Sequence, residues 1–130
     1  MQELFHKVAT PLIVVICGDA GGANAVAPVI EALRGEGCVS VKALAYRQAC
    51  ALWTKRGIDY QQIEDSITHA EIDSFLLVEN VVLLLTGTSF YPSLENKFVA
   101  AARENGLLSL AILDYWSHYG LRFSDTDGNL

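Results

Sequence analysis

The 130-residue sequence lacks three features that would define its function directly. It has no basic stripe: the net charge is −6, and Lys55-Arg56 is the only adjacent basic pair. Binding to nucleic acid through neutralised phosphates therefore has little support. The longest apolar runs, Pro11–Cys17 and Val81–Leu85, are far shorter than the roughly 20 residues of a membrane-spanning helix. The N-terminus does not have the pattern of a signal peptide.

Cysteine is also scarce. The three cysteines (Cys17, Cys38 and Cys50) are odd in number and have no metal-ligand spacing. They are predicted to be buried thiols in a reducing compartment, which makes the cytoplasm the expected location. Asp125-Thr126-Asp127-Gly128-Asn129 resembles the start of a calcium loop, but it lacks the later ligands and the bidentate Glu, so a turn is expected. We expect neither a metal nor a cofactor.

What the chain does contain is a regular alternation of strand-like and helix-like segments. Over half of the residues are hydrophobic, which suits a sheet buried on both faces within a single domain. The predicted strands are Leu12–Cys17, Val39–Ala45, Ile58–Ile63, Val81–Thr86 and Leu108–Leu113. The predicted helices are Asn24–Arg34, Arg47–Arg56, one or two within Glu64–Glu79, and Leu94–Asn105.

This β-α alternation predicts an α/β fold with a doubly wound, mostly parallel, five-stranded sheet. Right-handed crossovers favour the strand order 3-2-1-4-5, with helices on both faces, as in Rossmann-like domains. In the first helix, Asn24 is predicted as the cap, and Pro28 is acceptable if it lies in the first turn. Gly35 and Gly37 are predicted to end that helix.

Three loops are expected at the carboxyl edge of the sheet, where ligands bind in such folds. They are Gly18–Asn24, Gly87–Ser93 and Asp114–Tyr119. The first two follow strands that are neighbours in the predicted order, so they should face one crevice. The candidate ligand-binding residues in these loops are Gly18, Gly21, Gly22, Asn24, Gly87, Thr88, Ser89, Asp114, Trp116 and His118.

Each candidate has a structural alternative. Backbone amides of the glycine turn and of the helix start would bind an anion or sugar oxygens, or the glycines simply allow close packing. Asp19 is a candidate base or hydroxyl ligand, or a turn-stabilising side chain. Glu95 is a candidate catalytic carboxylate, or a surface carboxylate favoured by the helix dipole. Thr88 and Ser89 would bind a hydroxyl or phosphate, or cap the next helix.

The glycine turn matches neither common nucleotide fingerprint. In G-x-G-x-x-G counted from Gly18, Ala20 stands at the second glycine. No acidic residue follows the second strand to bind a ribose hydroxyl, and no G-K-[ST] is present. A nicotinamide-dependent oxidoreductase and a P-loop nucleotidase are therefore disfavoured.

Two segments nevertheless resemble a known superfamily. Residues 18–33, GDAGGANAVAPVIEAL, resemble the first βα turn of inverting GT-B glycosyltransferases. They are similar to the glycine-acid turn of lipid-A-disaccharide synthases and to an Ala-Pro-containing helix of UDP-N-acetylglucosamine 2-epimerases. Residues 86–123 resemble a G-T-S…E…A…G…D-x-W…Y…R-F pattern of bacterial nucleotide-sugar and polysaccharide-assembly proteins. The matching positions are Gly87, Thr88, Ser89, Glu95, Ala101, Gly106, Asp114, Trp116, Tyr119, Arg122 and Phe123.

The resemblance implies the acceptor-side, N-terminal Rossmann-like domain of a two-domain, nucleotide-sugar-dependent glycosyltransferase-like enzyme of polysaccharide or cell-envelope assembly, or half of a sugar 2-epimerase-like enzyme. Asp19 or Glu95 would be its base, and the ligand would be a sugar acceptor or a nucleotide sugar shared with a second domain. The chain would not be catalytically complete alone. Peripheral contact with a membrane is compatible with this reading. The competing hypothesis is a non-catalytic α/β module that binds a small anion or a partner protein at the same edge.

Overall fold

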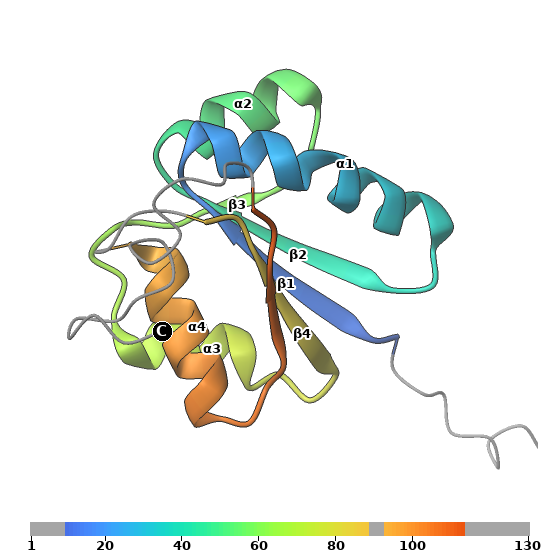
Figure 1. Cartoon of the computed structure of the whole chain (residues 1–130). Helices are drawn as coiled ribbons and strands as arrows, with labels where there is room; N and C mark the ends of the chain where they lie inside the picture. The colour runs from blue at the N-terminus through green and yellow to red at the C-terminus, as the bar shows by residue number, and fades with distance from the viewer. Residues whose placement is uncertain (1–9, 89–92, 114–130) are drawn as a thin grey trace, which may run out of the picture.

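The chain forms one five-stranded parallel sheet between two layers of helices (Figure 1). The computed structural model describes residues 10–88 and 93–113. The strand order is β3-β2-β1-β4-β5, and every neighbouring pair is parallel, as predicted. In chain order the elements are β1 (Leu12–Cys17), α1 (Ala20–Glu36), β2 (Ser40–Ala45), α2 (Gln48–Arg56), β3 (Gln61–Gln62), α3 (His69–Leu76), β4 (Val81–Thr86), α4 (Leu94–Glu104) and β5 (Ser109–Ala111).

The central strand β1 separates two hydrophobic cores. Successive side chains of a strand point to opposite faces. Val15 and Cys17 therefore belong to the core beneath α1 and α2, and Val14 and Ile16 belong to the core against α3 and α4. All four are fully buried. Burial on both faces explains why β1 reads as a continuous apolar run.

Helix α1 begins four residues earlier than predicted, and this corrects two expectations. Asp19, not Asn24, occupies the N-cap position, so Gly21 and Gly22 lie in the first helical turn. Pro28 then falls inside the helix rather than in its first turn. It removes one backbone hydrogen bond, to the carbonyl of Asn24. Both residues are on the exposed side of α1, where water can hydrate that carbonyl.

Glycines end the first two helices, but Gly35, which was also predicted to end the first one, lies inside α1. Gly37 (φ 74°) and Gly57 (φ 78°) adopt the left-handed conformation at the C-caps of α1 and α2. An added Cβ would meet nothing within 4 Å at either position. Backbone conformation, rather than packing, therefore selects glycine at these two sites.

Strand β3 is much shorter than the predicted Ile58–Ile63. Only Gln61 and Gln62 pair with β2, so the first part of β2 pairs with β1 on one side and with no strand on its outer side. The Arg34 side chain covers this edge: Nη2 donates to the Val41 carbonyl (3.1 Å) and Nη1 to the Asp59 carbonyl (2.9 Å).

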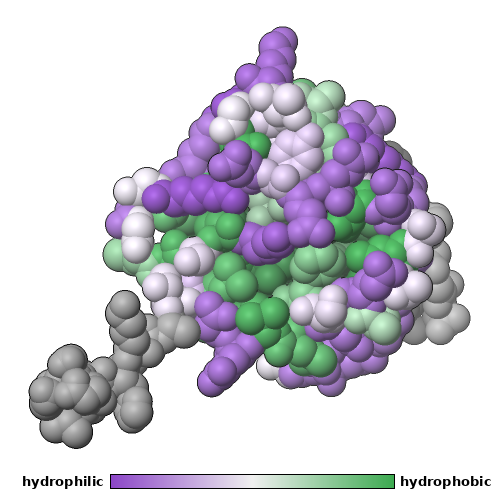
Figure 2. Space-filling view, turned by 180° about the vertical axis from the view of Figure 1, so that it is seen from behind, coloured by the Kyte–Doolittle hydropathy of each residue, from purple (hydrophilic) through white to green (hydrophobic). Residues whose placement is uncertain are grey.

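Figure 2 shows, on the side of the molecule behind the view of Figure 1, hydrophobic surface between hydrophilic upper and lower parts.

The cysteines differ from the prediction of three buried thiols. Cys17 is buried, Cys50 is half-buried and Cys38 is exposed. All three lie in the described part of the chain and none forms a disulfide. The last strand is also shorter than predicted, and Leu110 within it is 55% exposed.

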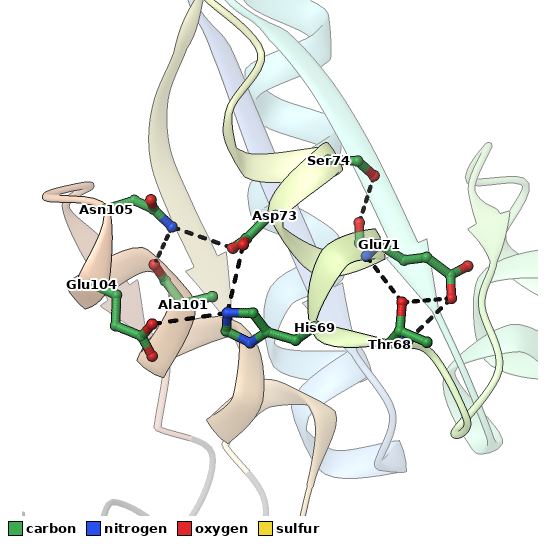
Figure 3. Close-up of polar contacts among 8 residues, drawn as sticks. All are labelled: Thr68, His69, Glu71, Asp73, Ser74, Ala101, Glu104 and Asn105. Carbon is green, nitrogen blue, oxygen red and sulfur yellow. Dashed lines mark hydrogen bonds and ion pairs between the residues drawn. The ribbon is translucent and has the colours of Figure 1, made fainter.

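Helices α3 and α4 lie side by side below the sheet and share a polar network (Figure 3). His69 Nε2 is 3.5 Å from an Asp73 oxygen and 3.8 Å from a Glu104 oxygen. Thr68 and Glu71 form a capping box at the start of α3: the Glu71 N–H donates to Thr68 Oγ1, and the Thr68 N–H donates to the Glu71 carboxylate, both at 3.1 Å. This pattern satisfies two amide donors that the helix itself leaves open.

We expect Thr68→Ala to lower the free energy of unfolding by about 1 kcal/mol, because it removes the N-cap acceptor of α3. Urea denaturation followed by circular dichroism measures this change. The control is Ser74→Ala, since Ser74 bonds only the Glu71 carbonyl of its own helix and should change stability by less than about 0.5 kcal/mol. Equal losses in the two variants would contradict the capping role.

Candidate functional site

The site begins at Gly18, where β1 ends. Its N–H donates to Glu95 Oε2 (3.1 Å), and its carbonyl accepts from the Ala49 N–H of α2 (3.0 Å). A Cβ at this position would lie 2.3 to 2.8 Å from ring carbons of Tyr46. Gly18 is therefore required by packing, and its backbone is tied to two other elements.

Tyr46 is the residue of this site that sequence reasoning missed. It directly follows β2 and is 1% exposed. Its hydroxyl donates to Glu95 Oε1 and accepts from the Leu94 N–H (3.1 Å) at the start of α4. Its own N–H donates to the Cys17 carbonyl (3.1 Å). A large polar aromatic at the end of a buried strand was the available signal, because a buried tyrosine hydroxyl usually has a partner.

Glu95 is buried, not a surface carboxylate as its place in the first turn of α4 had suggested. It is 2% exposed, and its two oxygens accept from Tyr46 and Gly18. Burial raises the pKa of Glu95, and the hydrogen bonds from Tyr46 and Gly18 oppose that shift. Burial also raises the pKa of Tyr46, and the neighbouring Glu95 charge raises it further. Glu95 is thus placed to hold the turn rather than to contact a ligand.

Asp19, the second candidate carboxylate, has a different environment. It is half-buried, and its side chain makes no capping hydrogen bond although it occupies the N-cap of α1. Asp19 is the N-cap residue of a 17-residue helix, and the helix dipole favours a negative charge at this end. Such a group can accept a hydroxyl proton or bind a hydroxyl.

Two glycines bring the first and second loops together. A Cβ on Gly87 would lie 2.8 Å from the Gly22 Cα, and a Cβ on Gly22 would lie 3.2 Å from the Gly87 Cα. The start of α1 therefore touches the loop after β4, which confirms that these two loops share one edge. Thr88 next to this contact is buried (4% exposed).

Of the remaining candidate residues, the structure describes two and leaves four outside its described ranges. Gly21 is half-buried in the first turn of α1, and Asn24 is exposed one turn later. Asn24 is therefore less closely associated with the Gly22–Gly87 contact. Ser89, Asp114, Trp116 and His118 lie outside the described residues, and their predicted roles stay predictions.

The hollows of the surface are only partly at this edge. A cavity of about 140 Å³ is lined by Arg47, Asp65, Ser93, Leu94 and Lys97. Larger hollows, of about 310 and 280 Å³, lie at α3–α4 and along β2. Within residues 10–88 and 93–113, no group of three His, Cys, Asp or Glu side chains could hold a metal ion. In the same part of the chain, no helix combines the length and apolarity needed to cross a membrane.

The chain resembles solved structures in its fold rather than in its sequence. No family model matches the sequence, and no curated protein matches it either. Similar solved structures are a Listeria monocytogenes protein assigned as a UDP-N-acetylglucosamine 2-epimerase (TM-score 0.64, 16% identity) and the Neisseria meningitidis UDP-N-acetylglucosamine 2-epimerase bound to UDP-N-acetylglucosamine (0.59, 15%). A third is another structure of a UDP-N-acetylglucosamine 2-epimerase (0.62, 13%).

These matches cover 81%, 78% and 91% of this chain but only 31%, 32% and 36% of the solved chains. The chain thus spans about a third of the length of these structures. At this identity the likeness shows a shared Rossmann-like α/β fold.

Substitution of Gly18 tests the packing at the centre of the site. We expect Gly18→Ala to lower the free energy of unfolding by about 2 kcal/mol or more, because its Cβ overlaps the Tyr46 ring. Gly35→Ala is the matched control, since Gly35 lies in α1 and an added Cβ there would meet no atom within 4 Å. Alanine at this position should raise the free energy of unfolding by about 0.5 to 1 kcal/mol. Thermal or urea denaturation of both variants measures these changes. An unchanged free energy of unfolding in Gly18→Ala would contradict the steric overlap with Tyr46.

The pH dependence of stability tests the buried carboxylate. Because the pKa of Glu95 is raised above its ordinary 4.5, the folded state binds this proton more tightly than the unfolded state. The contribution of Glu95 to stability is then fully present below about pH 4.5 and is lost as pH rises through the raised pKa. We expect the stability of the unsubstituted chain, relative to Glu95→Gln, to fall between about pH 4.5 and about pH 7.5. Urea unfolding at both pH values measures this, and an unchanged difference would contradict it.

Proposed function

We propose that this chain is the acceptor-side domain of a nucleotide-sugar enzyme resembling UDP-N-acetylglucosamine 2-epimerases and GT-B glycosyltransferases. The observation that carries the proposal is the glycine-lined edge between β1 and β4, on a sheet that shares its fold with part of three such epimerase structures. In parallel α/β sheets this edge is where ligands bind.

The ligand class is a nucleotide sugar, or a sugar acceptor used together with one. The solved Neisseria meningitidis epimerase binds UDP-N-acetylglucosamine, and this supports testing that compound first. Because the chain spans about a third of the similar structures, a further domain would supply the rest of the site. The chain is accordingly not expected to be catalytically complete alone.

Each carboxylate has its own role in this proposal. Asp19, the more exposed one, is the base that takes the proton of an acceptor hydroxyl as its oxygen attacks the anomeric carbon and the nucleotide leaves. Glu95 is the positioning residue that fixes Gly18 through a hydrogen bond. The amides of Gly21 and Gly22 at the start of α1 face the ligand oxygens.

The cellular setting belongs to the same proposal. We place the enzyme in the bacterial cytoplasm, in the assembly of a cell-envelope polysaccharide. The small number of cysteines, three without metal-ligand spacing, favours a reducing compartment.

Titration of the chain with UDP-N-acetylglucosamine, followed by amide NMR shifts, tests this function. We expect shifts to concentrate at residues 18–22 and 87–88. Asp19→Asn should weaken binding about tenfold, because it removes a charged hydrogen-bond acceptor. Asp59→Asn is the control, since Asp59 is exposed, lies before β3 and uses only its carbonyl in a described contact.

Two results would argue against the proposal. The first is silence of these amides at millimolar ligand. The second is equal affinity of the Asp19→Asn and Asp59→Asn variants, which would leave a ligand site at this edge without Asp19 as its carboxylate.

A further inference from the structure

The 140 Å³ cavity at the carboxyl edge brings together two basic side chains from different elements. Arg47 is the N-cap residue of α2, two positions after β2 ends, and Lys97 lies one turn into α4. Ser93, the N-cap of α4, and Leu94 also line the cavity. Since the Leu94 N–H bonds the Tyr46 hydroxyl, this cavity adjoins the network that holds Gly18.

The backbone of Arg47 is unusual. Its φ of 52° and ψ of −133° make it the one non-glycine residue with positive φ in the described part of the chain. Glycine adopts such a conformation without steric cost, and arginine does not. An arginine kept at a strained position next to a ligand-binding edge suggests that its side chain is used.

The Arg47 guanidinium is held in place but remains accessible. It lies 5.2 Å from the centroid of the Tyr46 ring. Its Nε and Nη2 donate to the same oxygen of Asp65, at 3.1 and 2.8 Å. The side chains of this ion pair are 45% and 56% exposed, so the pair itself contributes little to stability. An anion can therefore replace Asp65 at modest cost.

We propose that this cavity binds a phosphate group, with Arg47 as the bidentate ligand and Lys97 as the second cation. The planar guanidinium suits two oxygens of a phosphate, and the Ser93 hydroxyl can donate a third hydrogen bond. The inference rests on the proposed function, in which the phosphate belongs to a nucleotide sugar. The hydrogen bond to Asp65 raises the pKa of Arg47, and Asp19 adds a weaker attraction, so Arg47 and Asp19 lie within electrostatic reach.

The experiment is a calorimetric or NMR titration with inorganic pyrophosphate at low ionic strength. We expect Arg47→Gly to weaken binding about tenfold without loss of stability in urea, because glycine relieves the positive φ. Asp65→Asn should strengthen binding about threefold, because it removes the competing carboxylate. Weaker binding in Arg47→Gly together with stronger binding in Asp65→Asn is expected only if pyrophosphate binds at the Arg47–Asp65 ion pair itself.

The chain provides a matched control pair. Arg56 donates to both oxygens of Glu31 at 2.9 and 2.8 Å, with side chains 42% and 43% exposed, on α2 and α1. Arg56→Gln and Glu31→Gln change the net charge by the same amounts as the two test variants. They should leave pyrophosphate binding within about twofold if only the cavity charges matter.

Three outcomes would overturn the phosphate site: no binding of pyrophosphate by the unsubstituted chain, equal losses in Arg47→Gly and Arg56→Gln, or weaker binding in Asp65→Asn. Titration with UDP-N-acetylglucosamine separates this inference from the proposed function. Binding that survives Arg47→Gly unchanged contradicts the phosphate site alone. Pyrophosphate binding without any UDP-N-acetylglucosamine binding contradicts the proposed function alone.

Discussion

The buried carboxylate of Glu95 is the interaction on which the carboxyl edge of this sheet depends. It accepts hydrogen bonds from Tyr46 at the end of β2 and from Gly18 at the end of β1, while it is itself part of α4. A carboxylate taken out of water is costly unless its oxygens are satisfied. The three elements must therefore keep their relative positions for the chain to stay folded. A rigid edge is what a binding site between loops requires, because orientation is set before the ligand arrives.

This arrangement also gives the two candidate carboxylates different environments. Glu95 is buried, and both of its carboxylate oxygens accept hydrogen bonds from the protein. Asp19, next to Gly18, is partly exposed, and its side chain makes no capping hydrogen bond. Pairs of carboxylates in contrasting environments are common where one group does chemistry and the other fixes geometry. The cost of burying Glu95 is thus consistent with an edge whose geometry serves a function.

The fold was largely predictable, and the site only in part. Continuous apolar runs identify β1, which is buried on both faces, and β4, which is buried over its second half, and left-handed glycines mark the ends of α1 and α2. The start of α1 was misplaced because Gly21 and Gly22 resemble a turn, whereas the close approach of Gly87 is what requires glycine at Gly22. The role of Tyr46 could not be read locally, since its partner Glu95 is 49 residues away in sequence. Long-range hydrogen bonds leave no periodicity in the chain.

The glycines of this edge show why a fold can match at 13 to 16% identity while sequence searches find nothing. Gly18 is fixed by the ring of Tyr46, and Gly22 and Gly87 are fixed by each other. Each requirement is a contact between two positions, and another pair of residues of complementary size can meet it equally well. The core strands likewise need only apolar residues of suitable volume. The same shape can therefore be built from different residues, and the chemistry must be tested at polar groups that do not serve packing, such as the partly exposed Asp19 and the accessible Arg47.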